Sequence, residues 1–272
     1  MVPATAGLAG PQRSVRALAR AHKLPFIYID KMDERELAPL RALEPDLLLV
    51  GGFGIILKKP IITLPKIGCV NTHSSLLPRH RGPNPFTAVL LANEAESGVT
   101  FHVVDEHIDT GDILAQFRFP IEPADTAGMI HNRAAELAGE HVVAVMDRIE
   151  AEGLHGTPQD PALATYEKKL KEEDLYIDWN QPAVDVERFV RANFPFVLAR
   201  FRHAGRKVYV SKASADPAPV DAAPGTVVAV RPAVRIATGQ GTFTPYQAFS
   251  MKPFPWRWPR PMTRIQPGDK VE

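Results

Sequence analysis

Apolar and polar positions follow two different patterns along the 272 residues of this chain. Up to about residue 149, short continuous apolar runs alternate with segments whose apolar residues recur at helical spacing. Residues 46–57 begin with a continuous apolar run, which is typical of a parallel strand buried on both faces. Residues 33–44 have apolar residues at helical spacing and predict a helix that Asp33 would cap. This alternation predicts a doubly wound α/β domain. We also expect strands at 24–30, 67–73, 98–105 and 112–121, and helices at 14–23, 83–94 and 126–152.

The pattern changes beyond residue 155. Residues 156–173 have no clear apolar period, so we expect a linker there. One short helix is predicted at 184–193, and short β-like runs separated by turn residues follow it. These features predict a small, mostly antiparallel, OB-like β-barrel over 174–272. The sequence therefore indicates two domains, 1–155 and 174–272, joined by the linker.

Composition narrows the class of protein. Apolar residues make up 45% of the chain and charged residues 23%, with a net charge of +1, which is ordinary for a globular protein with a hydrophobic core. There is no apolar run of about 18 residues that would predict a membrane helix, and the start lacks the charged and apolar regions of a secretory signal. The single cysteine, Cys69, excludes an intrachain disulfide and a cysteine-based zinc site. We therefore expect a cytoplasmic protein that does not contact membranes.

Charge is distributed unevenly. From residue 174 onward there are 14 Lys and Arg against 8 Asp and Glu, so this part is basic while the rest of the chain is acidic. A basic domain can follow a phosphate backbone. A solvated basic surface would give the same composition.

Two polar residues end the predicted strand at 67–73. Side chains at i and i+2 of a strand point to the same face, so Asn71 and His73 would meet at the carboxyl end of the strand, where α/β sheets bind ligands. An amide donor beside an imidazole suits the stabilisation of an oxyanion or the transfer of a proton at a carbonyl carbon. The alternative is that His73 bonds a backbone carbonyl and Asn71 caps a turn.

An acidic loop lies between the last two predicted strands of this region. It contains Asp105, Glu106, Asp109 and Asp112, with Gly111 at a turn that would need a positive φ. Crowded carboxylates can hold a raised pKa and act as a base or orient a histidine. A solvated loop is the simpler interpretation, and the spacing does not match an EF-hand calcium loop.

Together these motifs resemble one family. "NTHSSLLPRHRG", followed by "ESGVTFHVVDEHIDTGDILAQ", is similar to the formyltransferases that use 10-formyltetrahydrofolate, and within them to methionyl-tRNA formyltransferases. Their hallmark is Asn-x-His, then Ser-Leu-Leu-Pro, then an Asp-x-Gly-x-Ile loop. Asn71, His73 and Asp109 stand at those places with matching order and spacing. The resemblance covers most of the chain and implies a Rossmann-like catalytic domain followed by the barrel.

The resemblance also implies a chemistry. A substrate amine attacks the formyl carbon of 10-formyltetrahydrofolate, Asn71 and His73 stabilise the oxyanion, and Asp109 orients His73 and helps to take the amine's proton. No metal is required. The residues implied to form the folate pocket are Phe53, Gly54, Ile55, Ile56, Leu57, Ser75, Leu76, Leu77, Pro78, Val104, Asp105 and Ile108.

Two features depart from the family pattern. The family begins with a strand, a helix and a second strand that have no counterpart before 14–23, so we expect a truncated start and an unpaired strand edge in the sheet. The basic loop with which the tRNA enzymes reach the acceptor stem would fall at 4–13, which contains a single arginine. In contrast, the aromatic and basic residues at 256–260 suit stacking on bases or sugars, and the alternative is that they are packing residues of a proline-rich tail.

These departures leave the acceptor open. Methionyl-tRNA is the first expectation, and an amino-sugar nucleotide is the second. Water as the acceptor would make the chain a formyltetrahydrofolate hydrolase. A folate-binding or tRNA-binding module without turnover is the non-enzymatic alternative.

Overall fold

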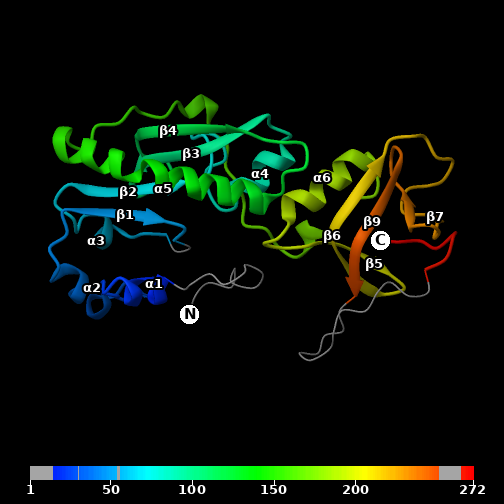
Figure 1. The fold of residues 1–272 in the computed structure, drawn as a ribbon, viewed down its shortest axis with the longest axis horizontal. Coiled ribbons are helices and arrows are strands. Elements are labelled where there is room, and N and C mark those ends of the chain that lie inside the picture. The colour runs from blue at the N-terminus through cyan, green and yellow to red at the C-terminus, as the bar shows by residue number, and fades with distance from the viewer. Residues whose placement is uncertain (1–14, 30, 54–55, 251–264) are drawn as a thin grey trace. The chain divides into compact units, whose positions relative to one another are not determined.

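The computed structural model describes residues 15–29, 31–53, 56–250 and 265–272, and the chain divides into two compact units (Figure 1). The first unit contains Met1–Pro85, Ala95–Ile121 and His131–Lys168. The second unit contains Phe86–Glu94, Glu122–Ile130 and Lys169–Glu272. Two short segments from the middle of the chain therefore group with the C-terminal part, which the sequence pattern does not indicate.

The helices and strands mostly begin and end within a few residues of the predicted limits. The helices are α1 (Val15–Ala21), α2 (Glu34–Arg41), α3 (Lys59–Ile62), α4 (Pro85–Leu91), α5 (Ala127–Glu152) and α6 (Ala183–Asn193). The strands are β1 (Leu47–Gly51), β2 (Gly68–His73), β3 (Glu96–Val103), β4 (Ile113–Pro120), β5 (Ala199–His203), β6 (Arg206–Asp216), β7 (Val227–Ala229), β8 (Arg235–Ala237) and β9 (Thr242–Ser250). The predicted cap is confirmed, because the Asp33 carboxylate accepts a hydrogen bond from the Glu36 backbone N–H at 3.0 Å.

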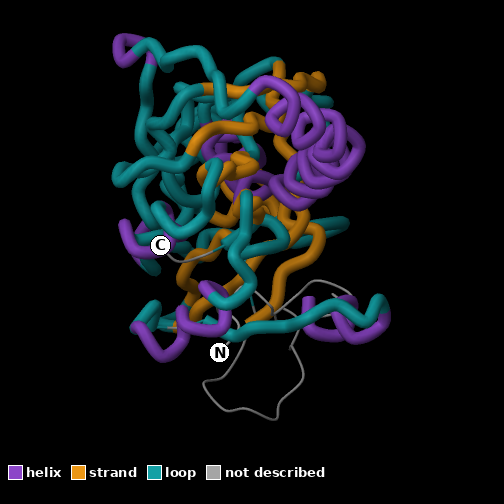
Figure 2. The backbone as a smooth tube through the Cα atoms, turned by 90° about the vertical axis from the view of Figure 1, so that its left-hand side faces the viewer, coloured by secondary structure: helices purple, strands orange, loops and turns teal. Residues whose placement is uncertain are grey.

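The first unit is built on a mixed sheet in the order β1-β2-β3-β4. The predicted parallel pairing is found between β1 and β2, but β2–β3 and β3–β4 are antiparallel. The β3–β4 pair is antiparallel because the loop 104–112 that joins the two strands contains no crossover helix, which a parallel pair needs. The β2 and β3 strands are antiparallel although α4 lies between them in the chain. The C-terminal half of α5 packs on the sheet and buries Val145 and Ile149 against Val99 and Phe101. Figure 2 looks almost along this helix and shows it on one side of the strands.

One predicted strand is not formed. Residues 24–29 are not assigned to a strand, and the side chains of Leu24, Phe26 and Tyr28 are largely exposed. A β-like composition gives a strand only when the segment pairs with a sheet edge, and residues 24–29 do not pair with the β1 edge. Among the strands that the structure describes, β1 is an edge of the sheet, and its Leu49 is 48% exposed.

The second unit contains a closed barrel. Its antiparallel sheet has the order β5-β6-β9-β8-β7. The last residues of the chain pair on both sides, as bridges join Val271 to His203 at the end of β5 and Lys270 to Thr226 before β7. This segment links the two outer strands and closes the sheet, which leaves no free edge at that point. Trp179, Phe201 and Phe243 pack edge to face inside the barrel.

Three sequence features lie outside the described residues. They are the weakly basic segment 4–13, Gly54 and Ile55 of the implied folate pocket, and the aromatic and basic residues at 256–260. Within the described parts of the chain, the helices are all too short or too polar to cross a membrane.

The barrel closure predicts a stability difference between two valines. Val271 is 5% exposed and belongs to the barrel core, whereas Val184 on α6 is 45% exposed. We expect Val271→Ala to lower the free energy of unfolding by about 2 kcal/mol, because it removes buried methyl groups and leaves a cavity. Val184→Ala, the matched control, should change it by less than about 0.5 kcal/mol. Urea unfolding followed by tryptophan fluorescence measures both, and equal effects would argue against the closure.

Candidate active site

The antiparallel pairing of β2 with β3 places Asn71 opposite a histidine that the sequence analysis did not identify. Asn71 on β2 lies directly opposite His102 on β3, and its amide nitrogen is 3.1 Å from Nε2 of His102. Nδ1 of His102 donates to the carbonyl of Val103 at 2.8 Å. A neutral His102 therefore has an unprotonated Nε2 that accepts from the Asn71 amide. This bond fixes the orientation of Asn71 and leaves its second amide hydrogen available to a ligand.

His73 is buried at the end of β2, and its ring nitrogens have two different partners. Nε2 donates to the carbonyl of His80 at 2.8 Å. In the neutral ring this leaves Nδ1 unprotonated, and Nδ1 is 3.5 Å from Oδ2 of Asp109. The alternative interpretation of His73, as a residue satisfied by a backbone carbonyl, therefore describes one nitrogen, while the other faces the acidic loop.

Asp109 joins the two histidines. Its Oδ2 accepts a hydrogen bond from the Gly82 backbone N–H at 2.8 Å, and its Oδ1 is 3.5 Å from Nε2 of His102. Asp109 has a φ of +53°, in the left-handed region, whereas Gly111 does not have a positive φ. The positive-φ position predicted at Gly111 is therefore at Asp109, and Asp is one of the non-glycine residue types that adopt this conformation more often than others.

Burial disfavours the charged forms of His73 and Asp109, so it acts on their pKa values in opposite directions. Burial lowers the pKa of His73 below its usual range, against the attraction of Asp109, so the imidazole is neutral near pH 7. Burial also opposes ionisation of Asp109. However, the attraction to a proton on His102 or His73 and the hydrogen bond from the Gly82 N–H outweigh this, and the pKa of the carboxyl is lowered. The raised pKa expected for crowded carboxylates is therefore wrong for Asp109.

The other acidic residue of the predicted site shapes the loop. The Asp105 carboxylate accepts hydrogen bonds from the His107 N–H at 2.9 Å and from the Thr110 hydroxyl at 2.7 Å. The Val104 N–H donates to the carbonyl of Cys69 on β2. These bonds attach the loop to the sheet, and Ile108 at its tip is 44% exposed.

The Ser-Leu-Leu-Pro segment is braced against β3. The buried Ser75 hydroxyl donates to the Arg79 carbonyl at 2.8 Å, and its own carbonyl accepts from Thr100 Oγ1 at 2.7 Å. The Leu77 N–H donates to the same Thr100 hydroxyl, and the Leu77 carbonyl accepts from Gln116. These bonds fix the turn after His73, since the polar groups of Ser75 and Leu77 are used inside the protein.

The remaining residues of the implied folate pocket stand in less buried positions. Leu76 and Pro78 are partly buried in this turn. Phe53 and Ile56 are 45% and 67% exposed after β1, whereas Leu57 packs on the cluster around Leu37. Their contact with a folate stays a prediction.

Sequence reasoning missed several residues around the site. His102 sits opposite Asn71 only because of the β2–β3 register, which the sequence does not reveal. His80 and Arg81 are also buried, at 4% and 5% exposure, although they belong to a segment whose charge reads as a solvated surface. Their polar partners are Gln159, Tyr166 and Glu167 of the predicted linker.

The burial of His73 predicts a dependence of stability on pH. The unfolded chain takes up a proton on this residue at about pH 6.5, whereas the folded chain does so only at lower pH. The stability linked to His73 is therefore fully present above about pH 6.5 and is lost as the pH falls below it. We expect the free energy of unfolding of the wild type to fall relative to that of His73→Gln by up to about 1.4 kcal/mol per pH unit below pH 6.

Urea unfolding between pH 5 and 8, followed by circular dichroism, measures this difference. His22→Gln, at an exposed position, serves as the control and should follow the wild type. Parallel curves for the wild type and His73→Gln would mean that burial does not depress protonation of His73.

The close packing around Gly111 predicts that a side chain at this position would destabilise the protein. A Cβ at this position would lie 2.0 Å from the Val103 carbonyl oxygen, a backbone atom that cannot move aside cheaply. We expect Gly111→Ala to destabilise the first unit by about 1–3 kcal/mol. Gly139→Ala on α5 meets nothing within 4 Å and should be neutral or stabilising by up to about 1 kcal/mol. Thermal unfolding tests the pair, and a tolerated Gly111→Ala would contradict the close approach.

Comparison with known proteins gives matches over both units. The family model described as "Formyl transferase" matches residues 10–146, and "Formyl transferase, C-terminal domain" matches 169–248. Methionyl-tRNA formyltransferase of Nitrosococcus oceani is 37% identical over 231 residues, 84% of this chain and 72% of the relative. The enzyme of the same name from Marinobacter nauticus is 40% identical over 204 residues, 75% of this chain and 66% of the relative. The chain thus spans about two thirds to three quarters of these relatives.

Solved structures share the fold. HypX from Aquifex aeolicus, in complex with tetrahydrofolic acid, has a TM-score of 0.63 at 24% identity over 80% of this chain and 38% of HypX. The N-formyltransferase of Helicobacter canadensis, with folinic acid and dTDP-3-aminofucose, has a TM-score of 0.65 at 20% identity over 88% of this chain and 84% of that one. With both family models matched in order and the Asn71, His73 and Asp109 side chains gathered at one end of the sheet, the chain belongs to the formyltransferase family.

Proposed function

We propose that this chain transfers a formyl group from 10-formyltetrahydrofolate to the amino group of methionyl-tRNA. The observation that supports this proposal best is the cluster in which a neutral His73 faces an ionised Asp109 beside the Asn71 amide. In a chain of the formyltransferase family, these three groups suit acyl transfer to an amine.

Asn71 would stabilise the charge that develops on the formyl oxygen. Attack by the amine nitrogen on the formyl carbon forms a C–N bond and moves the carbonyl electrons onto oxygen. The Asn71 amide, oriented by His102, has a second hydrogen to donate to this oxyanion. In the present orientation of His73, its Nε2–H is already donated to the His80 carbonyl, so an oxyanion contact from His73 stays a prediction.

His73 and Asp109 would move the proton. Nδ1 of His73 can accept the proton that the attacking amine loses, and the imidazolium then forms an ion pair with the Asp109 carboxylate. The tetrahedral intermediate collapses when the bond from the formyl carbon to the folate nitrogen breaks. That nitrogen takes a proton, so the products are tetrahydrofolate and the formylated amine.

Support for a folate donor comes from the family and from two structural relatives with tetrahydrofolic acid or folinic acid in their descriptions. The exposed Phe53 and Ile108 stand on the loops after β1 and β3. An apolar ring system would cover such side chains. The proposed donor is 10-formyltetrahydrofolate, because it carries the transferable formyl group.

Support for methionyl-tRNA comes from the relatives at 37% and 40% identity. The structural relatives include sugar N-formyltransferases, but these are only 19–20% identical. The basic charge of the C-terminal part also favours a polyanionic acceptor.

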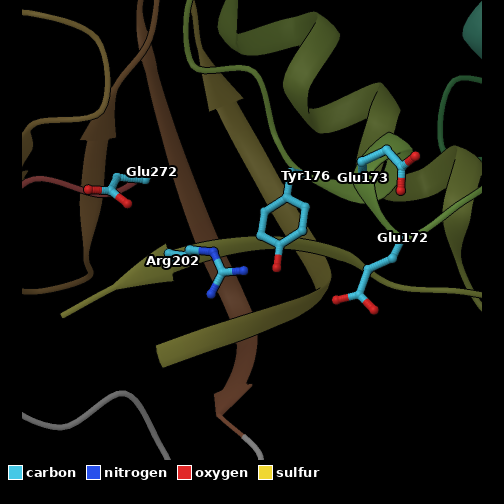
Figure 3. Close-up of a pocket in the computed structure, with 5 residues that line it drawn as sticks. All are labelled: Glu172, Glu173, Tyr176, Arg202 and Glu272. Atoms are coloured by element: carbon cyan, nitrogen blue, oxygen red, sulfur yellow. The ribbon is translucent and has the colours of Figure 1, made fainter. Parts of the chain in front are cut away.

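One pocket of the second unit is an unsuitable place for a phosphate. It is lined by Glu172, Glu173, Tyr176, Arg202 and Glu272 (Figure 3). The Arg202 guanidinium lies 5.2 Å from the centre of the Tyr176 ring. Glu172 also pairs with Lys207 and Arg200, so the cations around this pocket are engaged by its carboxylates rather than presented to a phosphate. We therefore expect tRNA phosphates to bind basic residues elsewhere in the C-terminal part.

We further propose that the chain acts in the cytoplasm. Its single cysteine, Cys69, is buried on β2. Burial raises the pKa of the Cys69 thiol to about 11, which keeps the thiol protonated and unreactive. A buried, unreactive thiol does not form a disulfide, and disulfides are what an oxidising compartment would favour.

The proposed reaction predicts which acceptor and which side chains matter. The wild type should release tetrahydrofolate and form N-formylmethionyl-tRNA when 10-formyltetrahydrofolate and charged initiator tRNA are supplied. Asn71→Ala should lower kcat by about 10²–10³-fold, as expected for loss of an oxyanion donor. His73→Ala and Asp109→Asn should each lower it by about 10²–10⁴-fold.

Parallel reactions with amino-sugar nucleotides and with buffer alone complete the assay. Turnover only with a sugar nucleotide would assign the second acceptor, and release in buffer alone would indicate a hydrolase. Salt-dependent tRNA binding without turnover would indicate a binding module. Full activity of all three variants would refute the proposed site.

A further inference from the structure

The predicted linker is held firmly against the first unit over residues 156–167, which we call the strap. Thr157 and Ile113 exchange two backbone hydrogen bonds of 2.8 and 2.9 Å. The Arg81 N–H donates to the Thr165 carbonyl, and the Arg81 carbonyl accepts from the Glu167 N–H. The strap thus crosses the first unit between β4 and the loop that follows Pro78.

Gln159 is the side chain by which the strap contacts the catalytic loop. Its Nε2 donates to the backbone carbonyls of Asp109 at 2.9 Å and Gly111 at 2.7 Å. Its Oε1 accepts from Nε of Arg81 at 3.1 Å and from Nη2 at 2.7 Å. The remaining Nη1 of Arg81 donates to the Tyr166 hydroxyl at 2.6 Å, so both ends of the strap meet the same guanidinium.

The far end of the strap contacts the His73 side of the site. The Glu167 carboxylate is 2.7 Å from Nδ1 of His80, whose carbonyl accepts the hydrogen bond from His73. The backbone approaches closely here too, since a Cβ on Gly82 would lie 2.8 Å from the Glu167 carbonyl oxygen. Gly82 is also the residue whose N–H bonds the Asp109 carboxylate.

We infer that the strap is a positioning element that sets the separation of His73 and Asp109, and that Gln159 is a positioning residue acting through the Asp109 backbone. This inference rests on the proposed function for its effect on turnover, but its geometric part can be tested without catalysis. Within the described part of the chain, the hydrogen bonds of Gln159 go to two backbone carbonyls and to Arg81, none of which is a reacting group.

The backbone of Asp109 explains why such a support is needed. Its φ of +53° is a conformation that L-residues rarely adopt, so other backbone conformations of this residue have a lower intrinsic energy. The paired donation from Gln159 to carbonyls on both sides of Thr110 holds the loop in this one state. A displacement of about 1 Å in a catalytic group can lower a rate about 100-fold.

The test compares Gln159→Glu and Gln159→Ala with Leu163→Ala, a strap control whose side chain is 59% exposed. Gln159→Glu keeps an acceptor for Arg81 but cannot donate to the two carbonyls, so it isolates the proposed role even if Gln159→Ala does not fold. We expect both variants of Gln159 to lower kcat about 10–100-fold, with KM for the formyl donor within about 2-fold. Leu163→Ala should behave as the wild type.

A double-mutant cycle with Asp109→Asn separates positioning from general damage. If Gln159 acts through Asp109, adding Gln159→Glu to Asp109→Asn should lower kcat by less than about 2-fold further. The same factor in both backgrounds would overturn the inference, and so would an unchanged kcat in the single variants.

Hydrogen exchange at the Gly82 amide supplies a readout that does not need activity. This N–H is bonded to the Asp109 carboxylate at 2.8 Å, and a displaced Asp109 would release it. We expect exchange at Gly82, measured by NMR, to be faster by about tenfold or more in Gln159→Glu and unchanged in Leu163→Ala. If the wild type transfers no formyl group, the proposed function fails, while faster Gly82 exchange still supports the strap and unchanged exchange overturns it.

Discussion

The burial of the Asp109 carboxylate is the constraint on which the first unit depends. A carboxylate taken out of water loses several kcal/mol of hydration unless other groups replace it. Here the Gly82 N–H donates to Oδ2, and the imidazole nitrogens of His73 and His102 lie 3.5 Å from the two carboxylate oxygens. These groups come from β2, β3 and the loop that follows Pro78, so three segments must converge on one point. At this point of convergence the Asp109 backbone has a left-handed φ of +53°.

The same burial determines the protonation states on which the proposed chemistry relies. His73 is neutral near pH 7 because burial lowers its pKa, although the Asp109 charge and the hydrogen bond to the His80 carbonyl favour the protonated form. Asp109 keeps its charge because the Gly82 N–H donates to the carboxylate and because a proton on either facing imidazole would be attracted to it. A neutral base beside an ionised carboxylate can accept a proton and then be stabilised as a cation. Neither state would follow from an exposed loop with the same residues.

Local patterns identified much of the fold. Helical spacing located α5 and α6, and a continuous apolar run located β1, because these signals depend on neighbouring residues only. The strand expected at 24–30 is not formed over residues 24–29, because strand formation depends on pairing with a distant segment and these residues do not pair with the β1 edge. Similarly, the linker prediction for 156–173 missed the strap, since its polar residues bond distant carbonyls rather than water.

The sequence alone determined the residue types of the candidate site. Asn71 and His73 share a strand face through the two-residue period, and the spacing to Asp109 marks the family. Only the tertiary structure decided how these groups meet. The β2–β3 register placed His102 between Asn71 and Asp109, and the close approach of Val103 to Gly111 explained a glycine for which the sequence suggested a positive φ. Register and burial arise from contacts between segments far apart in the chain, so the local pattern of residues does not contain them.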